Sequence, residues 1–136
     1  MRTVDELMQT PFWIIDLLPH QVPPNSPGQY FAIEQYFLQE PRRTEVKQAH
    51  ANLILKVNSY MDIRLEEGGW LNPTPEVLAN AVHTTPINIL VGDSLITSNP
   101  DDSYLTLYDP DEELLELIGT LVKGEGLYLW KPLGLE

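Results

Sequence analysis

Histidines are the side chains of this sequence best suited to proton transfer near neutral pH, and the chain has three of them, His20, His50 and His83. No two stand at a metal-ligand spacing such as His-x-x-x-His. His50 lies beside the apolar stripe of a predicted helix, where we expect it to be partly buried and hydrogen-bonded. Asp16 and His20 flank the end of one predicted strand. One alternative function is therefore a small enzyme or ligand-binding domain, in which His20 or His83 works with Asp16 in a pocket at a sheet edge.

No catalytic motif accompanies these residues. Gly-x-Ser-x-Gly, a glycine-rich phosphate loop and His-Glu-x-x-His are all absent. Cysteine is absent too, which excludes thiolate chemistry and cysteine zinc sites, and no cofactor is predicted. Catalytic groups can converge in space without a sequence motif, so the question of an enzyme stays open. The absence of motifs favours a non-enzymatic protein.

Acidic charge is the most unusual property of the chain. The formal net charge is −12, and no lysine or arginine occurs between Leu65 and Val122. Such a field repels nucleic-acid phosphates and anionic lipids, and it attracts basic proteins. The sequence therefore predicts no nucleic-acid or membrane partner and makes a basic protein the candidate partner. The alternative left open is that the charge only keeps the protein soluble.

Acidic residues are densest between positions 101 and 116, and they define the predicted partner-binding face. A turn at 98–102 and a helix start near Asp109 explain these acids without a cation, so no metal is predicted. Trp70 lies in a predicted turn, where we expect it to be exposed, and exposed tryptophans often anchor interfaces. The predicted partner-binding residues are Asp101, Asp102, Asp111, Glu112, Glu113, Glu116 and Trp70.

The length of 136 residues is typical of one domain, and we expect residues 1–136 to form a single globular unit. The first ten residues include Asp5 and Glu6 and do not resemble a secretory signal, which together with the lack of cysteine suggests a cytoplasmic protein. The oligomeric state is left open, including a homo-oligomer.

Residues 12–19 form an apolar run that predicts a buried strand. The segment 29–38 is either helix or strand: its aromatic residues favour a strand, whereas Ser26, Pro27 and Gln29 match a capping box and favour a helix. In both cases we expect its apolar side chains to reach the core, with the proline-rich run 19–27 as a stiff connection.

Helical spacing of apolar residues predicts a long helix over 41–59, in which Lys47 is expected to face solvent. Thr74 and Pro75 indicate the start of a second helix. Strands at 87–91 and 94–97 flank Gly92-Asp93, a favoured hairpin turn. A strand at 104–108, a helix that Asp109 caps and a final strand at 127–132 follow.

These elements predict an α+β domain. We expect a mixed sheet of four to six strands, helices mostly on one face, and a C-terminal β-hairpin followed by strand–helix–strand. The function that the sequence favours is a non-enzymatic, acidic, cytoplasmic protein-interaction module, such as an immunity- or antitoxin-like protein that neutralises a basic partner.

Overall fold

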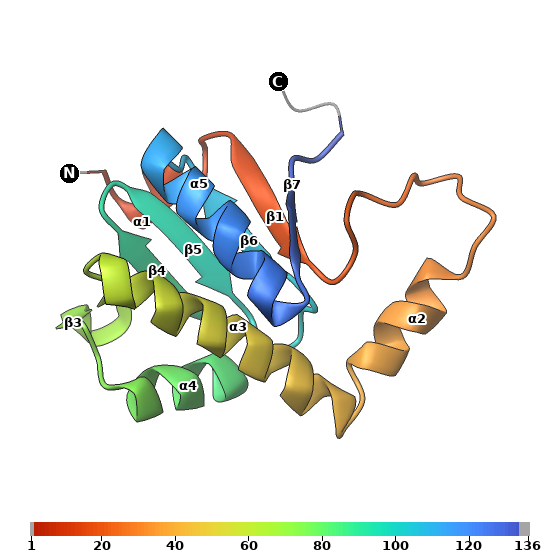
Figure 1. Ribbon diagram of the computed structural model, residues 1–136, viewed down its shortest axis with the longest axis horizontal. Helices are drawn as coiled ribbons and strands as arrows, with labels where there is room; N and C mark the ends of the chain where they lie inside the picture. The colour runs from red at the N-terminus through yellow and green to blue at the C-terminus, as the bar shows by residue number, and fades with distance from the viewer. Residues whose placement is uncertain (1, 134–136) are drawn as a thin grey trace.

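One seven-stranded sheet organises the described part of the chain, residues 2–133, in this computed structural model (Figure 1). Every pair of neighbouring strands is antiparallel. The predicted α+β class is confirmed, whereas the predicted mixed sheet of four to six strands is wrong in strand number and direction. In sheet order the strands are β3 (Trp70–Leu71), β2 (Arg64–Leu65), β4 (Ile87–Val91), β5 (Ser94–Ser98), β6 (Leu105–Tyr108), β1 (Phe12–Asp16) and β7 (Tyr128–Trp130).

The position of β1 explains why the sheet is not mixed. The predicted strand–helix–strand unit is present as β6, α5 and β7, and its two strands run parallel to each other. They are not neighbours, because β1 lies between them and is antiparallel to both. Phe12 pairs with Tyr108 on one side of β1, and Ile14 pairs with Trp130 on the other. This pairing joins the first strand of the chain to the last two, and no local pattern indicates it.

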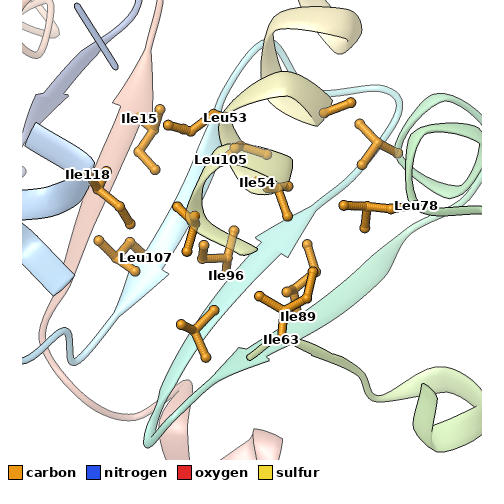
Figure 2. Close-up of a cluster of buried hydrophobic side chains, with 14 of the residues drawn as sticks. Ile15, Leu53, Ile54, Ile63, Leu78, Ile89, Ile96, Leu105, Leu107 and Ile118 are labelled. Atoms are coloured by element: carbon orange, nitrogen blue, oxygen red, sulfur yellow. The ribbon is translucent and has the colours of Figure 1, made fainter. Parts of the chain in front are cut away.

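Three helices cover one face of the sheet, as predicted (Figure 1). Because successive side chains of a strand point to opposite faces, one set of strand residues meets these helices. Figure 2 shows Leu53 and Ile54 of α3 among Ile96 and Leu105 of two neighbouring strands, and all four are fully buried. The three helices are α3 (Arg42–Tyr60), α4 (Pro75–Thr84) and α5 (Glu112–Leu121).

The opposite face of the sheet is less covered. The short helix α1 (Val4–Leu7) contacts β5, and Leu7 and Leu95 are buried there outside the main core. Along the other edge of this face runs the connection from β1 to α2. Two hydrogen bonds anchor the beginning of that connection: the Trp130 indole donates to the Leu18 carbonyl at 3.0 Å, and the Leu133 amide donates to Gln21 Oε1 at 2.7 Å.

Residues 29–38 form a helix, α2 (Tyr30–Phe37), but neither its start nor its surroundings match the prediction. Gln29 is the N-cap and makes no side-chain cap bond, and the Ser26 hydroxyl accepts only the Gly28 amide at 3.4 Å. No residue of α2 is buried, so the expectation that its apolar side chains reach the core is wrong. The reason is geometric, since α3, α4 and α5 already occupy the core face and α2 stands away from it (Figure 1).

Lys47 corrects a second expectation, because its side chain is fully buried rather than solvated. Its ammonium donates to the backbone carbonyls of Asn99 and Asp102 at 2.8 and 3.0 Å. These two bonds tie α3 to the turn between β5 and β6. Burial lowers the pKa of Lys47 to about 8, which the nearby Asp102 carboxylate partly opposes.

The start of α5 lies two residues later than predicted. Asp111, not Asp109, caps the helix by accepting the Leu114 amide at 2.8 Å. Asp109 instead has a left-handed backbone with φ 48° and forms an ion pair with Arg2 at 2.7 Å. The Asp109 amide still bonds to the Pro11 carbonyl beside β1, so the chain stays with the sheet up to Asp109 and turns there before the helix begins. Short 3₁₀ helices follow β2 (η1, Glu67–Gly69) and α5 (η2, Val122–Glu125).

Candidate functional site

A cavity of about 450 Å³ lies on the sheet face that the three large helices leave uncovered. It extends over β6, β1 and β7, and the β1–α2 connection and the start of α2 form its wall. Its volume is within the range of small-molecule and side-chain binding pockets. Six of its lining residues carry the argument below: Phe12, Asp16, Tyr30, Tyr104, Tyr108 and Trp130.

Strand register builds the floor of this site. Asn88 pairs with Thr97, Thr97 with Thr106, and Thr106 with Ile14, so these residues form one row across four strands. Ile14 in turn pairs with Trp130 on β7. The row is polar over β4, β5 and β6 and becomes apolar and aromatic over β1 and β7. A ligand on this face therefore meets hydroxyl and amide groups at one end and rings at the other.

A second cavity of about 250 Å³ adjoins the first, because Tyr104 and Thr106 line both. It lies over the β4 and β5 end of the row, between Met8 and the turn that follows β5. Its acidic lining residues are Glu67 and Asp102. We call the two cavities together the sheet-face groove.

The sheet-face groove is acidic. Three carboxylates line it, Asp16, Glu67 and Asp102, and no lysine, arginine or histidine is among the lining residues. Burial raises the pKa of Asp102, although the Lys47 ammonium opposes this increase. Burial likewise raises the pKa of Tyr104. The groove therefore attracts cations and disfavours further negative charge.

Asp16 is the most unusual residue of the groove. The residue is 8% exposed, and one carboxylate oxygen accepts the Leu17 amide at 2.7 Å. No ion pair to Asp16 is present among the described residues. Burial and the charge of Glu34 raise the pKa of Asp16, whereas backbone hydrogen bonds oppose the increase. A buried acid without a counter-charge is costly to folding, which makes it a candidate for function.

Helix α2 supplies one wall of the first cavity through Tyr30. The Tyr30 hydroxyl donates to Glu34 Oε2 at 3.1 Å, and burial together with this carboxylate raises the pKa of Tyr30 to about 12. The outer face of α2 is apolar and exposed: Phe31 is 77% and Tyr36 53% exposed. Exposed aromatic side chains beside a groove are typical of interaction surfaces.

The histidine–aspartate pocket predicted from the sequence is not assembled. His20 is exposed, does not line the cavity and makes no hydrogen bond or ion pair with Asp16 among the described contacts. His83 lies on α4 in the helical layer and bonds to Gln48 Oε1 at 3.2 Å. Only the Asp16 half of that prediction lies in a cavity. His50 is buried as expected, but the expected hydrogen bond is absent, because neither ring nitrogen has a partner within the described part of the chain.

The predicted partner-binding acids do not form one face. Asp101 and Asp102 precede β6 and Asp111 follows it, so the length of that strand separates the two groups. Glu112, Glu113 and Glu116 are exposed on α5, in the helical layer. Trp70 is 52% exposed, as predicted, but it lies on β3 at the far edge of the sheet. Asp102 alone of the seven lines the groove.

Sequence reasoning missed the aromatic lining of the groove. Tyr104 and Tyr108 alternate with the core residues Leu105 and Leu107, so period-2 alternation places both tyrosines on the uncovered face. This signal was present in the sequence. The sequence did not indicate that β1 lies beside β6, and this pairing adds Phe12 and Asp16 to the same face.

No group of three or more histidine or acidic side chains that could hold a metal ion is found in residues 2–133. None of the helices described in this range is long and apolar enough to cross a membrane. No protein-family model, curated protein or solved structure matches the chain.

Proposed function

We propose that this protein is a non-enzymatic interaction module that binds a basic protein through the sheet-face groove. One observation carries the proposal: three carboxylates and no cationic side chain line two joined cavities on an uncovered sheet face. The net charge of −12 extends the same sign of field beyond the groove. A basic partner would be steered toward the groove and bound there by complementary charge.

The surroundings of the groove support a protein rather than a simple ion as the ligand. The exposed ring of Phe31 on α2 contacts Tyr30, which lines the groove, with ring centroids 5.6 Å apart, and Tyr36 is exposed further along the same helix. Charged contacts give an interface its orientation and association rate, whereas aromatic anchors supply much of its affinity. The partner should therefore present cationic side chains with apolar residues beside them.

The specific role that we propose is neutralisation of a basic cytoplasmic protein, in the manner of an immunity protein or antitoxin. A protein that binds nucleic acid carries a cationic surface for phosphates. An acidic, preformed groove can occupy such a surface and exclude the nucleic acid. The small size of the chain and its excess of acids fit this role.

Binding to cationic peptides, measured by calorimetry at several salt concentrations, tests the proposal. Arginine- and lysine-rich peptides with interspersed leucines should bind, and affinity should fall as salt rises. The double variant Glu67→Gln/Asp102→Asn should weaken binding by about tenfold, since partly solvated ion pairs contribute roughly 0.2–1 kcal/mol each and tenfold corresponds to about 1.4 kcal/mol. The matched control Glu45→Gln/Glu76→Gln removes two exposed charges from the helical layer and should change affinity by less than about twofold.

Two results would contradict the proposal. Equal losses in the two double variants would show that only net charge matters and not the groove. A larger loss in Glu112→Gln/Glu113→Gln would place the interface on α5 instead, where the sequence alone predicted it.

A second candidate function is a ligand-binding or catalytic site that uses Asp16 without a histidine. The observation that favours it is the raised pKa of this buried carboxyl group inside a cavity of about 450 Å³. Here Asp16 would exchange a proton with a small molecule. Thermal-shift screening of small metabolites against the native protein and Asp16→Asn tests this candidate, because a stabilising compound should lose its effect in the variant.

A further inference from the structure

The first cavity of the groove combines a buried carboxylate with several aromatic rings. Asp16 lies near Tyr30 and Tyr104, Trp130 pairs with Ile14 two residues along β1, and Tyr108 lines the far end of the cavity opposite Phe12. We propose that this cavity binds the guanidinium group of a single arginine side chain from the partner protein. The inference rests on the proposed function and gives the partner a chemical signature.

The charge of Asp16 is the first reason. Asp16 is 8% exposed as a residue and has no ion pair among the described residues, and its carboxylate accepts only backbone amides there, with that of Leu17 at 2.7 Å. Transfer of an unpaired carboxylate out of water is unfavourable. A cation that enters the cavity supplies the missing counter-charge, and the low local dielectric strengthens the attraction.

The aromatic lining is the second reason. The negative face of an aromatic ring attracts a cation, and tyrosine and tryptophan do so well. Burial raises the pKa values of Tyr30 and Tyr104, and both lie close enough to Asp16 for its charge to add to this increase. Phe12 and Tyr108 form a tilted pair with ring centroids 5.6 Å apart at the other end of β1. Aromatic rings around one carboxylate suit an organic cation better than a hydrated metal ion, which prefers several oxygen ligands.

The choice of arginine over lysine follows from hydration and shape. A guanidinium group is planar, stacks on rings, and can donate two parallel bonds to one carboxylate. It is also more weakly hydrated than an ammonium group, so its transfer into this cavity costs less. A lysine ammonium would reach the same carboxylate but would lose more hydration.

The walls of the cavity are held in place before any ligand binds. The Trp130 indole donates to the Leu18 carbonyl at 3.0 Å, and the Tyr30 hydroxyl donates to Glu34 at 3.1 Å. The first bond ties the β1–α2 connection to β7, and the second orients the Tyr30 ring. A preformed site loses little conformational entropy on binding.

Nitrogen–proton NMR spectra of the full chain test the inference, with the Trp130 indole resonance as the reporter. The probes are the capped peptide Gly-Gly-Arg-Gly-Gly, its lysine counterpart, its neutral citrulline counterpart, and free agmatine as a guanidinium compound that is not part of a protein. The affinity is read from the shift of the Trp130 resonance as each probe is added. We expect the arginine peptide to bind most tightly, the lysine peptide to bind more weakly, and the citrulline peptide to cause no shift.

Variants separate the cavity from the general acidic field. Asp16→Asn keeps an acceptor for the Leu17 amide and should lower the affinity for the arginine peptide at least about tenfold. Tyr104→Leu removes a ring without changing the charge and should lower the affinity for the arginine peptide about threefold to tenfold. Asp5→Asn, an exposed residue of α1 outside the groove, is the matched charge control and should change affinity by less than about twofold.

Equal losses in Asp16→Asn and Asp5→Asn would overturn the arginine site but leave the proposed function standing on net charge. Equal affinity for the lysine and arginine peptides would overturn the guanidinium assignment. Agmatine binding more tightly than the arginine peptide would overturn the assignment to a protein side chain. Failure of the leucine-containing cationic peptides in calorimetry would instead refute the proposed function, whatever the single-arginine peptide does.

Discussion

Acid should destabilise this protein through His50, a buried histidine in the middle of α3. The side chain is fully buried, and neither ring nitrogen has a hydrogen-bond partner among the described residues. Burial first, and then the charge of Lys47, lowers the pKa of His50 from 6.5 to about 3, whereas the nearby Ser103 backbone opposes part of this decrease. The folded protein therefore keeps this imidazole neutral at a pH where the unfolded chain protonates it.

The sign and size of the effect follow from the two pKa values. Because the folded pKa is the lower one, the unfolded state binds more protons between pH 6.5 and pH 3, and stability falls as the pH falls through this range. A pKa difference of about 3.5 corresponds to about 5 kcal/mol at the acid limit. Between pH 7.5 and pH 5 the loss should be about 2 kcal/mol.

The substitution His50→Leu isolates this effect. It removes both the titrating group and the two unpaired ring nitrogens, so the variant should be about 1–3 kcal/mol more stable than the native chain at pH 7.5. At pH 5 the advantage should grow by about 2 kcal/mol. Urea unfolding at pH 5, 6 and 7.5, followed by circular dichroism, measures both quantities, and His20→Gln serves as an exposed-histidine control.

Two results would refute this reasoning. If the native chain and His50→Leu lost stability in parallel as pH falls, then His50 would not be the titrating group. If His50→Leu were less stable than the native chain at pH 7.5, then the imidazole would make a favourable polar contact in the core.

Three other predictions use the same unfolding assay. The native chain should gain stability between pH 8 and pH 10, because the folded pKa of Lys47, about 8, lies below the ordinary 10.5, and Lys47→Met should not show this gain. The same pH dependence in both chains would contradict this. Asp111→Ala should cost about 1 kcal/mol through loss of the α5 cap, and an unchanged midpoint would show that the cap contributes nothing. Leu53→Ala should lower the free energy of unfolding by about 3 kcal/mol, whereas Phe31→Ala should lower it by less than about 1 kcal/mol because Phe31 is 77% exposed. Similar losses in the two variants would mean that α2 is packed against the rest of the protein.

Local patterns predicted most of the elements of the fold. Thr74 caps α4 through the Val77 amide at 3.3 Å, as its place before Pro75 indicated. Gly92, with φ 57°, makes the hairpin between β4 and β5. These features depend on residues only a few positions apart, so the sequence contains the information that they need.

The candidate site was less predictable. Asp16 was singled out from the sequence, but its predicted partners His20 and His83 lie elsewhere. Its actual neighbour Tyr104 directly precedes β6, about ninety positions away in the chain, and Tyr108 of β6 lines the same cavity. Only the insertion of β1 between β6 and β7 brings them together, and this pairing competes with many others of similar local quality.

The sequence by itself determined the acidic charge, the α+β class and the alternation that gives each strand two different faces. Tertiary structure decided which of those faces α3, α4 and α5 cover and which stays open. It also decided that Lys47 is buried and that α2 is not. The physical reason is that caps, turns and alternation arise from short-range contacts, whereas burial and strand order depend on long-range packing that the whole chain must satisfy at once.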